Sequence, residues 1–431
     1  ISALADAITC ALLIVIARRI IRNDVIALLP GVLWAISPMS VTFAIGGMET
    51  SINILWMTAA VWLFTHPARR PIHEIGLGVC AALGVITRID AVLWIAPLFA
   101  WQLIESIIRQ RRLPAYTWVA AALTYLPWLI FAWAYFHSPI PNSINAKSVA
   151  YSVTAGSALV RFIQTYATPF SEFETFGSVG AMIGSVAYLL LSVLAIISAA
   201  RRMPRLIAWL IYPWLYLIVF SAANPLIFRW YVAPPLPALM MGIIVGVWAI
   251  FGAKQEKDSN AKETRQFGVV ITAFIGMVWV FTSINGWTLH PDHGWDRPAP
   301  RMAWHEIELL YQQVGTMLRE EYGVTAETRV ASADIGAVGY FSRATIVDTV
   351  GLVTPELRRY YPFDPALLAE GQNYAIPPAL IQDTSPDYLV TMEGFIRLGL
   401  ARESWFNEQY EVLREIPFEF YGSAMLVYAR R

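Results

Sequence analysis

Long apolar stretches alternate with short polar loops along residues 1–289. Six uncharged stretches are each long enough to cross a bilayer as a helix, which takes about 20 residues, and four shorter apolar runs lie among them. The long stretches are 25–48, 113–136, 175–200, 206–228, 230–253 and 266–289, and the shorter runs are 1–17, 50–65, 75–87 and 91–104. The pattern predicts a polytopic α-helical membrane protein with about ten transmembrane helices.

Composition supports this class of protein. Hydrophobic residues make up 57% of the 431 residues and charged residues 14%, against roughly 25% charged in soluble domains. The net charge is zero, so no overall basic field favours nucleic acid as a partner. The two cysteines, Cys10 and Cys80, both lie in apolar runs, which excludes a disulfide framework.

Because the chain begins at Ile1 inside an apolar run, we expect a fragment that lacks its true N-terminus.

The loops predict the orientation of the helices. Basic residues cluster in every second loop of the ten-helix alternation, and cytoplasmic loops are the ones that carry such an excess. The clusters are Arg18/Arg19/Arg22, Arg69/Arg70, Arg109/Arg111/Arg112, Arg201/Arg202/Arg205 and Lys254/Lys257/Lys262/Arg265. We therefore expect these loops in the cytoplasm, and both Ile1 and the C-terminal segment on the outer side of the membrane.

Residues 287–431 differ in character from the apolar part. They carry 20 Asp/Glu and 12 Arg, with no Lys and no run long enough to span. Helical spacing over 301–322 is followed by short β-rich runs at 328–332, 344–350, 387–391, 410–416 and 424–428. We expect a transmembrane domain over 1–286 and an extracytoplasmic α/β domain over 287–431 that ends in an antiparallel pair of strands.

The polar groups predicted at the outer ends of the helices are few. Ionisable side chains near the apolar region are costly and suggest function. Three cations there suit an anionic group such as phosphate, and neighbouring carboxylates could act as a base or orient a hydroxyl. The cations are Arg88, Lys147 and Arg229, and the carboxylates are Glu49 and Asp90.

Each of these residues also has a structural explanation. Glu49 could stabilise the start of a helix, and Arg88 with Asp90 could form an ion pair at a short turn. Lys147 could contact lipid headgroups, and Arg229 beside Trp230 could anchor the helix at the interface. What favours function is that all of them fall on one side of the membrane.

Other polar clusters in the tail carry less chemistry. His290, His293 and His305 lie near Asp292 and Asp296, but no metal-ligand spacing repeats. The glycines of 334–339 resemble a nucleotide-binding turn without its first glycine, which is a weak signal. We expect a tight turn from a strand to a helix there.

The outer-face motifs resemble one family. Gly-Met-Glu-Thr at 47–50, Arg-Ile-Asp at 88–90, Pro-Ile-Pro-Asn-Ser-Ile-Asn-Ala-Lys at 139–147 and Arg-Trp-Tyr at 229–231 look like polyprenyl-phosphate-sugar-dependent glycosyltransferases of the glycosyltransferase C superfamily. The segments 334–340 and 346–352 look like the C-terminal signature of one branch of this family, the mycobacterial terminal arabinofuranosyltransferases. The chain most resembles that branch.

This resemblance implies an inverting sugar transfer, at the outer face of a bacterial plasma membrane, from a polyprenyl phosphate carrier to a cell-envelope glycan or glycolipid. Lys147 and Arg229, with Arg88 as a third cation, would bind the donor phosphate. Glu49, Asn142 and Tyr231 would bind the sugar or the acceptor. No cofactor is certain, although a divalent metal could take part.

The family's base is an Asp in the first outer loop, which would precede Ile1. This chain alone would then be inactive, with Glu49 or Asp90 as substitute candidates for the base. Two other classes of function remain open. One is a membrane-anchored binding or sensor protein that works through its outer domain. The other is a lipid-linked sugar transporter, which predicts charges buried in mid-membrane and related halves.

Overall fold

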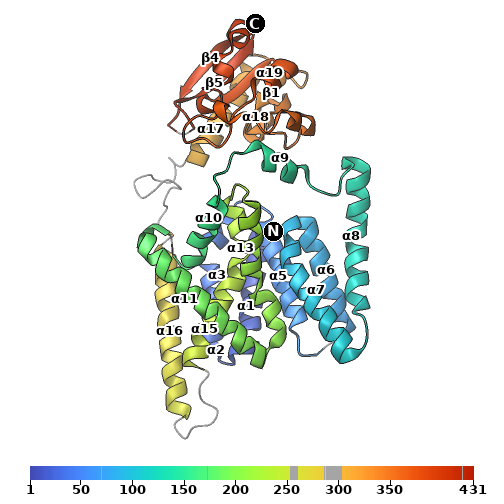
Figure 1. The fold of residues 1–431 in the computed structure, drawn as a ribbon, viewed down its shortest axis with the longest axis vertical. Coiled ribbons are helices and arrows are strands. Elements are labelled where there is room, and N and C mark those ends of the chain that lie inside the picture. Colours follow the sequence, from blue (N-terminus) through green and yellow to red (C-terminus); the bar gives the residue numbers. More distant parts are fainter. Residues whose placement is uncertain (69, 172, 253–260, 286, 288–302, 420) are drawn as a thin grey trace. The chain divides into compact units, whose positions relative to one another are not determined.

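The structure is a computed structural model that describes residues 1–68, 70–171, 173–252, 261–285, 287, 303–419 and 421–431 (Figure 1). The chain forms two compact units, which we call the membrane unit and the C-terminal unit. The membrane unit comprises Ile1–Pro139 and Gly156–Thr288, and the C-terminal unit comprises Ile140–Ala155 and Leu289–Arg431. A single cut near 286 therefore does not separate the two units, because the segment 140–155 belongs to the second one.

The membrane unit is a bundle of helices. Its elements are α1 (Ser2–Ile21), α2 (Asp24–Ala27), α3 (Leu29–Ala35), α4 (Pro38–Ile45), α5 (Thr50–Phe64), α6 (Pro71–Thr87), η1 (Ile89–Ala91), α7 (Val92–Glu105), α8 (Ala115–Phe136), α10 (Ser157–Ala167), α11 (Phe173–Arg202), α12 (Ile207–Leu210), α13 (Tyr212–Ala223), α14 (Arg229–Val232), α15 (Leu236–Phe251) and α16 (Ala261–Asn285). Each apolar run predicted from the sequence is mostly helical in the described residues, with breaks at Ser37 and over 224–228.

Fewer helices than ten meet the criteria for a full span. Within the described residues, five are long and apolar enough, or six if the pair Asp24–Ala35 and Pro38–Ile45, bent by 53°, counts as one span. Three others, Thr50–Phe64, Pro71–Thr87 and Leu236–Phe251, are apolar but shorter. The chain is a multi-pass membrane protein. Helix length and composition support five or six full spans among the described residues, fewer than the ten predicted.

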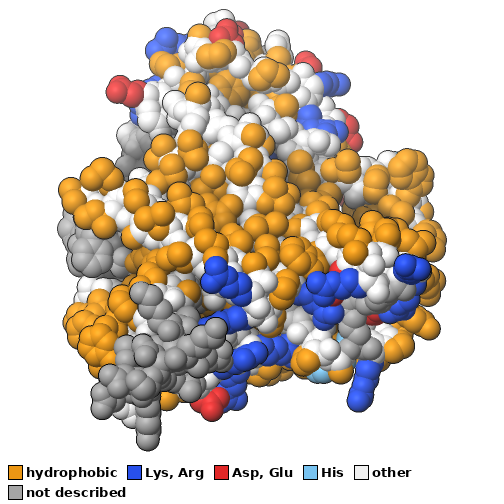
Figure 2. Space-filling view, turned by 60° about the horizontal axis from the view of Figure 1, so that its bottom comes forward, with side chains coloured by type: hydrophobic (Ala, Val, Ile, Leu, Met, Phe, Trp, Pro, Cys, Tyr) orange, Lys and Arg blue, Asp and Glu red, His pale blue; other side chains and the backbone are white. Residues whose placement is uncertain are grey.

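The packing of the bundle fits a lipid environment. Trp34, Trp94 and Trp209 are completely buried in its interior, whereas α8 exposes most of its apolar side chains. Figure 2 shows this apolar surface around the bundle, and such a continuous surface requires a partner, which for a bundle of apolar helices is lipid. Helices approach closely where a glycine faces a neighbouring backbone, as at Gly246 of α15 beside α11.

Arginines gather at one end of the bundle (Figure 2). Arg205 donates to Glu105 at 3.0 Å, and Arg112 pairs with Glu74 at 2.6 Å. Arg19 donates to the carbonyl of Trp62 at 2.7 Å. Several of the predicted basic loops thus meet at one arginine-rich end, as the alternation requires.

The C-terminal unit is an α/β domain with one sheet in the order β2-β1-β3-β5-β4. Its strands β1 (Arg329–Ser332), β2 (Thr345–Asp348), β3 (Tyr388–Met392), β4 (Tyr410–Pro417) and β5 (Ala424–Arg430) coincide with the five predicted runs. The β1–β2 and β1–β3 pairs are parallel, while β3–β5 and β4–β5 are antiparallel, so the predicted closing pair is confirmed.

Short helices complete this unit. They are α9 (Asn142–Ala150), α17 (Ala303–Glu320), α18 (Ile335–Ser342), α19 (Pro378–Thr384) and α20 (Ser404–Gln409). Helix α17 covers the described part of the predicted helix at 301–322. Asp334 is the N-cap residue of α18 directly after β1, which confirms the predicted strand-to-helix turn.

Candidate functional site

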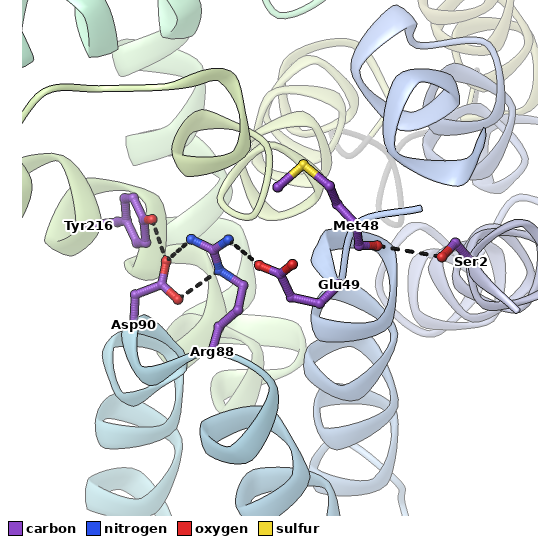
Figure 3. Close-up of polar contacts among 6 residues, drawn as sticks. All are labelled: Ser2, Met48, Glu49, Arg88, Asp90 and Tyr216. Carbon is purple, nitrogen blue, oxygen red and sulfur yellow. Dashed lines mark hydrogen bonds and ion pairs between the residues drawn. The ribbon is translucent and has the colours of Figure 1, made fainter. Parts of the chain in front are cut away.

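Two predicted site motifs meet where α5 begins and α6 ends (Figure 3). The Arg88 guanidinium donates through Nε and Nη2 to the two oxygens of Asp90, each at 3.0 Å. Through Nη1 it donates to Glu49 Oε1 at 2.9 Å. Tyr216 O–H donates to Asp90 Oδ2 at 2.7 Å. The structure thus joins Glu49, Arg88 and Asp90 in one network, which we call the carboxylate network.

Helix ends place these side chains. Glu49 is the N-cap residue of α5, and the preceding turn uses Gly47 at φ +72°, a backbone conformation that suits glycine. Arg88 is extended between α6 and η1, and Asp90 lies two residues further, in η1. A planar guanidinium can bind one carboxylate with two nitrogens and a second with the third, so arginine fits this position better than lysine does.

Burial divides the carboxylate network into an inner and an outer part. The side chains of Arg88 and Asp90 are 8% and 11% exposed, whereas Glu49 is 42% exposed. Among the described residues, Glu49 Oε2 accepts no hydrogen bond. Arg88 therefore has its nitrogens committed to carboxylates, and Glu49 is the member that a substrate can reach.

Helix α14 links this network to a pocket. Tyr231 lies over the Arg88 guanidinium, with 5.4 Å between Cζ and the ring centroid, which is the geometry of a cation–π contact. Arg229, two residues earlier in the same short helix, lines a pocket at this end of the bundle. The predicted residues Arg229 and Tyr231 thus serve neighbouring parts of one region.

The pocket has a mixed apolar and polar wall, and its described charged residues are both cations. Arg161 and Arg229 supply two guanidinium groups, and the other polar side chains of its wall are uncharged. These are Ser37, Gln164, Thr165, Thr168, Ser171 and Ser283. Two arginines among hydroxyl and amide groups, with no carboxylate among the described residues of the wall, form a site suited to an anion with several oxygens, such as a phosphate.

Helix α10 carries Arg161, and its attachment explains where this arginine lies. Asn224 Oδ1 accepts from the Ala158 N–H at 3.1 Å at the start of the helix, and Tyr166 O–H donates to the Pro213 carbonyl at 2.8 Å near its end. Phe162 is fully buried, whereas Val160 on the other side is exposed. Such an amphipathic helix is typical of the membrane interface.

The sequence analysis misses two ionisable residues of this unit. Arg161 carries no motif, and only the amphipathic spacing of apolar residues over 157–167 could have indicated it. Asp6 lies within the first apolar run and is 7% exposed. It accepts from Trp34 Nε1 at 2.9 Å and from Ser40 Oγ at 2.5 Å. One carboxylate is therefore buried among the helices. Its hydrogen bonds join α1 to α3 and α4, which is a structural role.

The other two predicted residues lie in the C-terminal unit. Asn142 is the first residue of α9, and its Nδ2 donates to the carbonyls of Gly351 at 2.7 Å and Leu352 at 2.8 Å. Lys147 is half-buried in the last turn of the same helix. The Asn142 amide nitrogen is therefore used within the C-terminal unit.

A metal site is not apparent in the part of the chain that the structure describes. No group of three His, Cys, Asp or Glu side chains there could hold an ion. His290, His293, Asp292 and Asp296 lie outside the described residues, as does the side chain of His305.

The membrane unit thus carries a polar region at one end of its helical bundle, and the chain also contains a small α/β domain. The chain is similar to the crystal structure of ArnT from Cupriavidus metallidurans bound to undecaprenyl phosphate. The TM-score is 0.50 at 16% identity, covering 99% of this chain and 83% of that one. The apo ArnT structure from the same organism gives 0.47 at 14% identity over the same shares.

At the level of sequence, residues 301–428 match a family model described as a domain of unknown function, DUF8728. No curated protein matches the chain. The comparisons therefore establish the fold and leave the role of the C-terminal unit open.

Proposed function

We propose that this chain transfers a sugar from a polyprenyl phosphate carrier to a glycan or glycolipid of the cell envelope. The pocket formed by Arg161 and Arg229 is the observation that carries the proposal, because it offers two cations to an anion in a fold shared with ArnT. The ligand of that ArnT structure, undecaprenyl phosphate, is the class of carrier that we assign here. Transfer is inverting and takes place at the outer face of the bacterial plasma membrane.

Different residues bind the phosphate leaving group and the hydroxyl groups of the sugar or acceptor. Arg229 and Arg161 bind the carrier phosphate and stabilise the charge that it gains as the bond to the sugar breaks. Lys147 stays a predicted phosphate ligand by its resemblance to the family motif. Glu49 accepts a hydrogen bond from a hydroxyl of the sugar or acceptor. Arg88 holds Glu49 in place, since its own nitrogens already bind carboxylates.

Of the two carboxylates in the network, Glu49 is the better candidate for a base. Asp90 is bound by both Arg88 and Tyr216 and is nearly buried. A general base must reach the proton that it removes, and the exposed Glu49 can do so. The mycobacterial arabinofuranosyltransferase branch remains our prediction for the closest function, and neither the sugar nor the acceptor follows from the pocket.

Binding of the carrier tests the proposal directly. Purified full-length chain should bind undecaprenyl phosphate more tightly than undecaprenol, which has the same tail and no phosphate. Arg229→Ala and Arg161→Ala should each weaken undecaprenyl phosphate binding about tenfold, the scale of a lost hydrogen bond to a charged group, and leave undecaprenol binding unchanged. Arg18→Ala, at the arginine-rich end, is the control. Equal binding of the two lipids by the wild type would refute the proposal.

A further inference from the structure

The apolar stretch 25–48 of the membrane unit is broken between α3 and α4. The helical parts Asp24–Ala35 and Pro38–Ile45 meet at an angle of 53°. Ser37 is extended at the break, and Pro38 is the first residue of α4. A break in an apolar segment leaves main-chain donors and acceptors without their helical partners, so these groups need other partners.

The main-chain groups on the α3 side of the break have partners. The Ile36 carbonyl accepts from Trp287 Nε1 at 2.6 Å. The Ser37 N–H donates to the Trp34 carbonyl at 3.1 Å, and the Ser37 carbonyl accepts from the Val41 N–H at 3.1 Å. The break is therefore an ordered feature of the bundle.

The donors at the start of α4 are different. Pro38 has no N–H, and the N–H groups of Met39 and Ser40 come too early in α4 to have a partner inside the helix. Ser37 is the N-cap residue, and its side chain caps neither of them. In the described part of the chain, no other group accepts from these two donors. The helix thus begins with two main-chain donors and the positive end of its dipole.

Ser37 supplies a second, independent sign of a ligand at this place. It is 3% exposed and lines the pocket that contains Arg161 and Arg229, as do Pro38 and Met39. Its hydroxyl has no hydrogen-bond partner among the described residues. An unpaired polar group that is almost buried is costly unless a ligand or water binds it. The hydroxyl and the helix start therefore face the same pocket.

Asp6 of α1 holds α4 in this position. Its two oxygens accept from Trp34 of α3 and from the hydroxyl of Ser40 in α4, so one carboxylate binds both sides of the break. Gly31 brings α3 close to α1, since an added Cβ would lie 2.7 Å from the Cys10 carbonyl oxygen. Asp6 binds side chains only and uses none of the main-chain donors at the start of α4.

We propose that the start of α4 completes the phosphate site. The hydroxyl of Ser37 and the N–H groups of Met39 and Ser40 bind the carrier phosphate together with Arg161 and Arg229. This inference rests on the proposed function and adds three donors to it. Helix N-termini favour anions because the N–H groups and the dipole act together, and broken membrane helices can present such ends to anionic groups. The arginines supply charge, and the main-chain donors fix the orientation of the phosphate.

The Met39 amide gives the direct readout, in purified full-length chain labelled with ¹⁵N-methionine. The chain has 12 methionines, and Met39→Leu identifies the Met39 signal by its loss. Undecaprenyl phosphate should move the Met39 amide proton downfield, because this proton gains a hydrogen bond to a charged oxygen. Undecaprenol, which has no phosphate, should not move it. Met57, which is buried in α5 and does not line the pocket, is the internal control.

A pair of serines tests the hydroxyl. Ser37→Ala should weaken binding of undecaprenyl phosphate about tenfold, the scale of a lost hydrogen bond to a charged group, and leave undecaprenol binding unchanged. Ser192→Ala is the matched control. Ser192 is also 3% exposed, but its hydroxyl donates to the Tyr188 carbonyl at 2.8 Å within α11, so its loss should alter binding of neither lipid.

The outcomes separate this inference from the proposed function. If the wild type prefers undecaprenyl phosphate to undecaprenol and Arg229→Ala weakens that binding, the proposed function stands. A Met39 amide that undecaprenyl phosphate does not move, or an affinity of Ser37→Ala equal to that of the wild type, then overturns this inference alone. If Ser37→Ala does not fold, the Met39 signal of the wild type decides. Equal binding of the two lipids by the wild type overturns both.

Discussion

Arg88 is the residue on which the carboxylate network depends. Its guanidinium separates Asp90 from Glu49 and hydrogen-bonds to both, in a region where the arginine is 8% exposed. Removing one partner of a buried ion pair leaves an uncompensated charge, which is costly. The same arginine is therefore a source of stability and the means by which Glu49 is oriented.

Substitution of Arg88 should reduce stability more than substitution of its neighbours. Arg88→Ala should lower the free energy of unfolding by about 3 kcal/mol, the scale for breaking a buried pair. Tyr216→Phe, which removes one hydrogen bond to Asp90, should cost about 1 kcal/mol. Arg88→Lys should not restore wild-type stability, because an ammonium group cannot bind Asp90 in the same forked geometry. Denaturant titration of the purified protein in detergent measures this, and equal stability of Arg88→Ala and wild type would contradict it.

At the residue scale, the sequence predicted ionisable residues near helix ends but not their partners. Glu49, Arg88 and Asp90 could be selected because charge is rare in apolar surroundings. That Arg88 joins Glu49, 39 residues away, depends on how α5 and α6 pack. Arg161 could not be selected, because an arginine in a polar loop is unremarkable until α10 brings it beside Arg229.

Close packing of helices depends on single glycines at the element scale. Gly246 of α15 faces α11, where an added Cβ would lie 2.2 Å from the Leu191 carbonyl oxygen. Gly242 lies one turn earlier in α15, and its Cβ would find its nearest neighbour at an ordinary 3.7 Å. Small residues that let backbones approach are a general feature of membrane helices.

These two glycines provide a matched pair of substitutions. Gly246→Ala should lower the free energy of unfolding by about 2 kcal/mol, since the helices must move apart to admit the methyl group. Gly242→Ala should leave stability unchanged or raise it slightly, because alanine is the better helix former. Thermal unfolding of both variants in the same detergent compares them. A larger loss for Gly242→Ala would show that the α11–α15 contact is not as described.

Elements were more predictable than their assembly. All five strands of the C-terminal unit follow from β-rich runs between turn residues, because the pattern is local. The assignment of α9 to that unit is not local, since Asn142 contacts a turn beyond residue 350. The sequence also predicted one continuous span at 25–48. The structure instead bends between α3 and α4, because Pro38 begins a new helix after extended Ser37.

Charge asymmetry of the membrane unit is the feature from which its orientation is predicted. Arginines collect at one end of the membrane unit (Figure 2), and the carboxylate network and the pocket lie at the other. The positive-inside rule predicts that the arginine-rich end faces the cytoplasm. The proposal that transfer occurs outside the plasma membrane depends on this orientation.

Cysteine labelling tests the orientation. In a chain without Cys10 and Cys80, Glu408→Cys in the C-terminal unit should react with a membrane-impermeant maleimide on intact spheroplasts. Arg202→Cys, at the arginine-rich end, should react only after the membrane is opened. Both positions are exposed, so accessibility reports the side of the membrane. Labelling of Arg202→Cys in intact spheroplasts would reverse the topology.

The most direct test of the central claim is the lipid content of cells whose only copy of the full-length protein carries Glu49→Gln. This change keeps the shape of the side chain and removes its charge, with Asp24→Asn at the arginine-rich end as the control. Mass spectrometry of extracted lipids should show a polyprenyl phosphate carrying a sugar that accumulates in the Glu49→Gln cells alone, and its mass would identify the sugar class. Identical polyprenyl lipids in the wild-type, Glu49→Gln and Asp24→Asn cells would contradict the claim that this chain is a polyprenyl-phosphate-dependent glycosyltransferase.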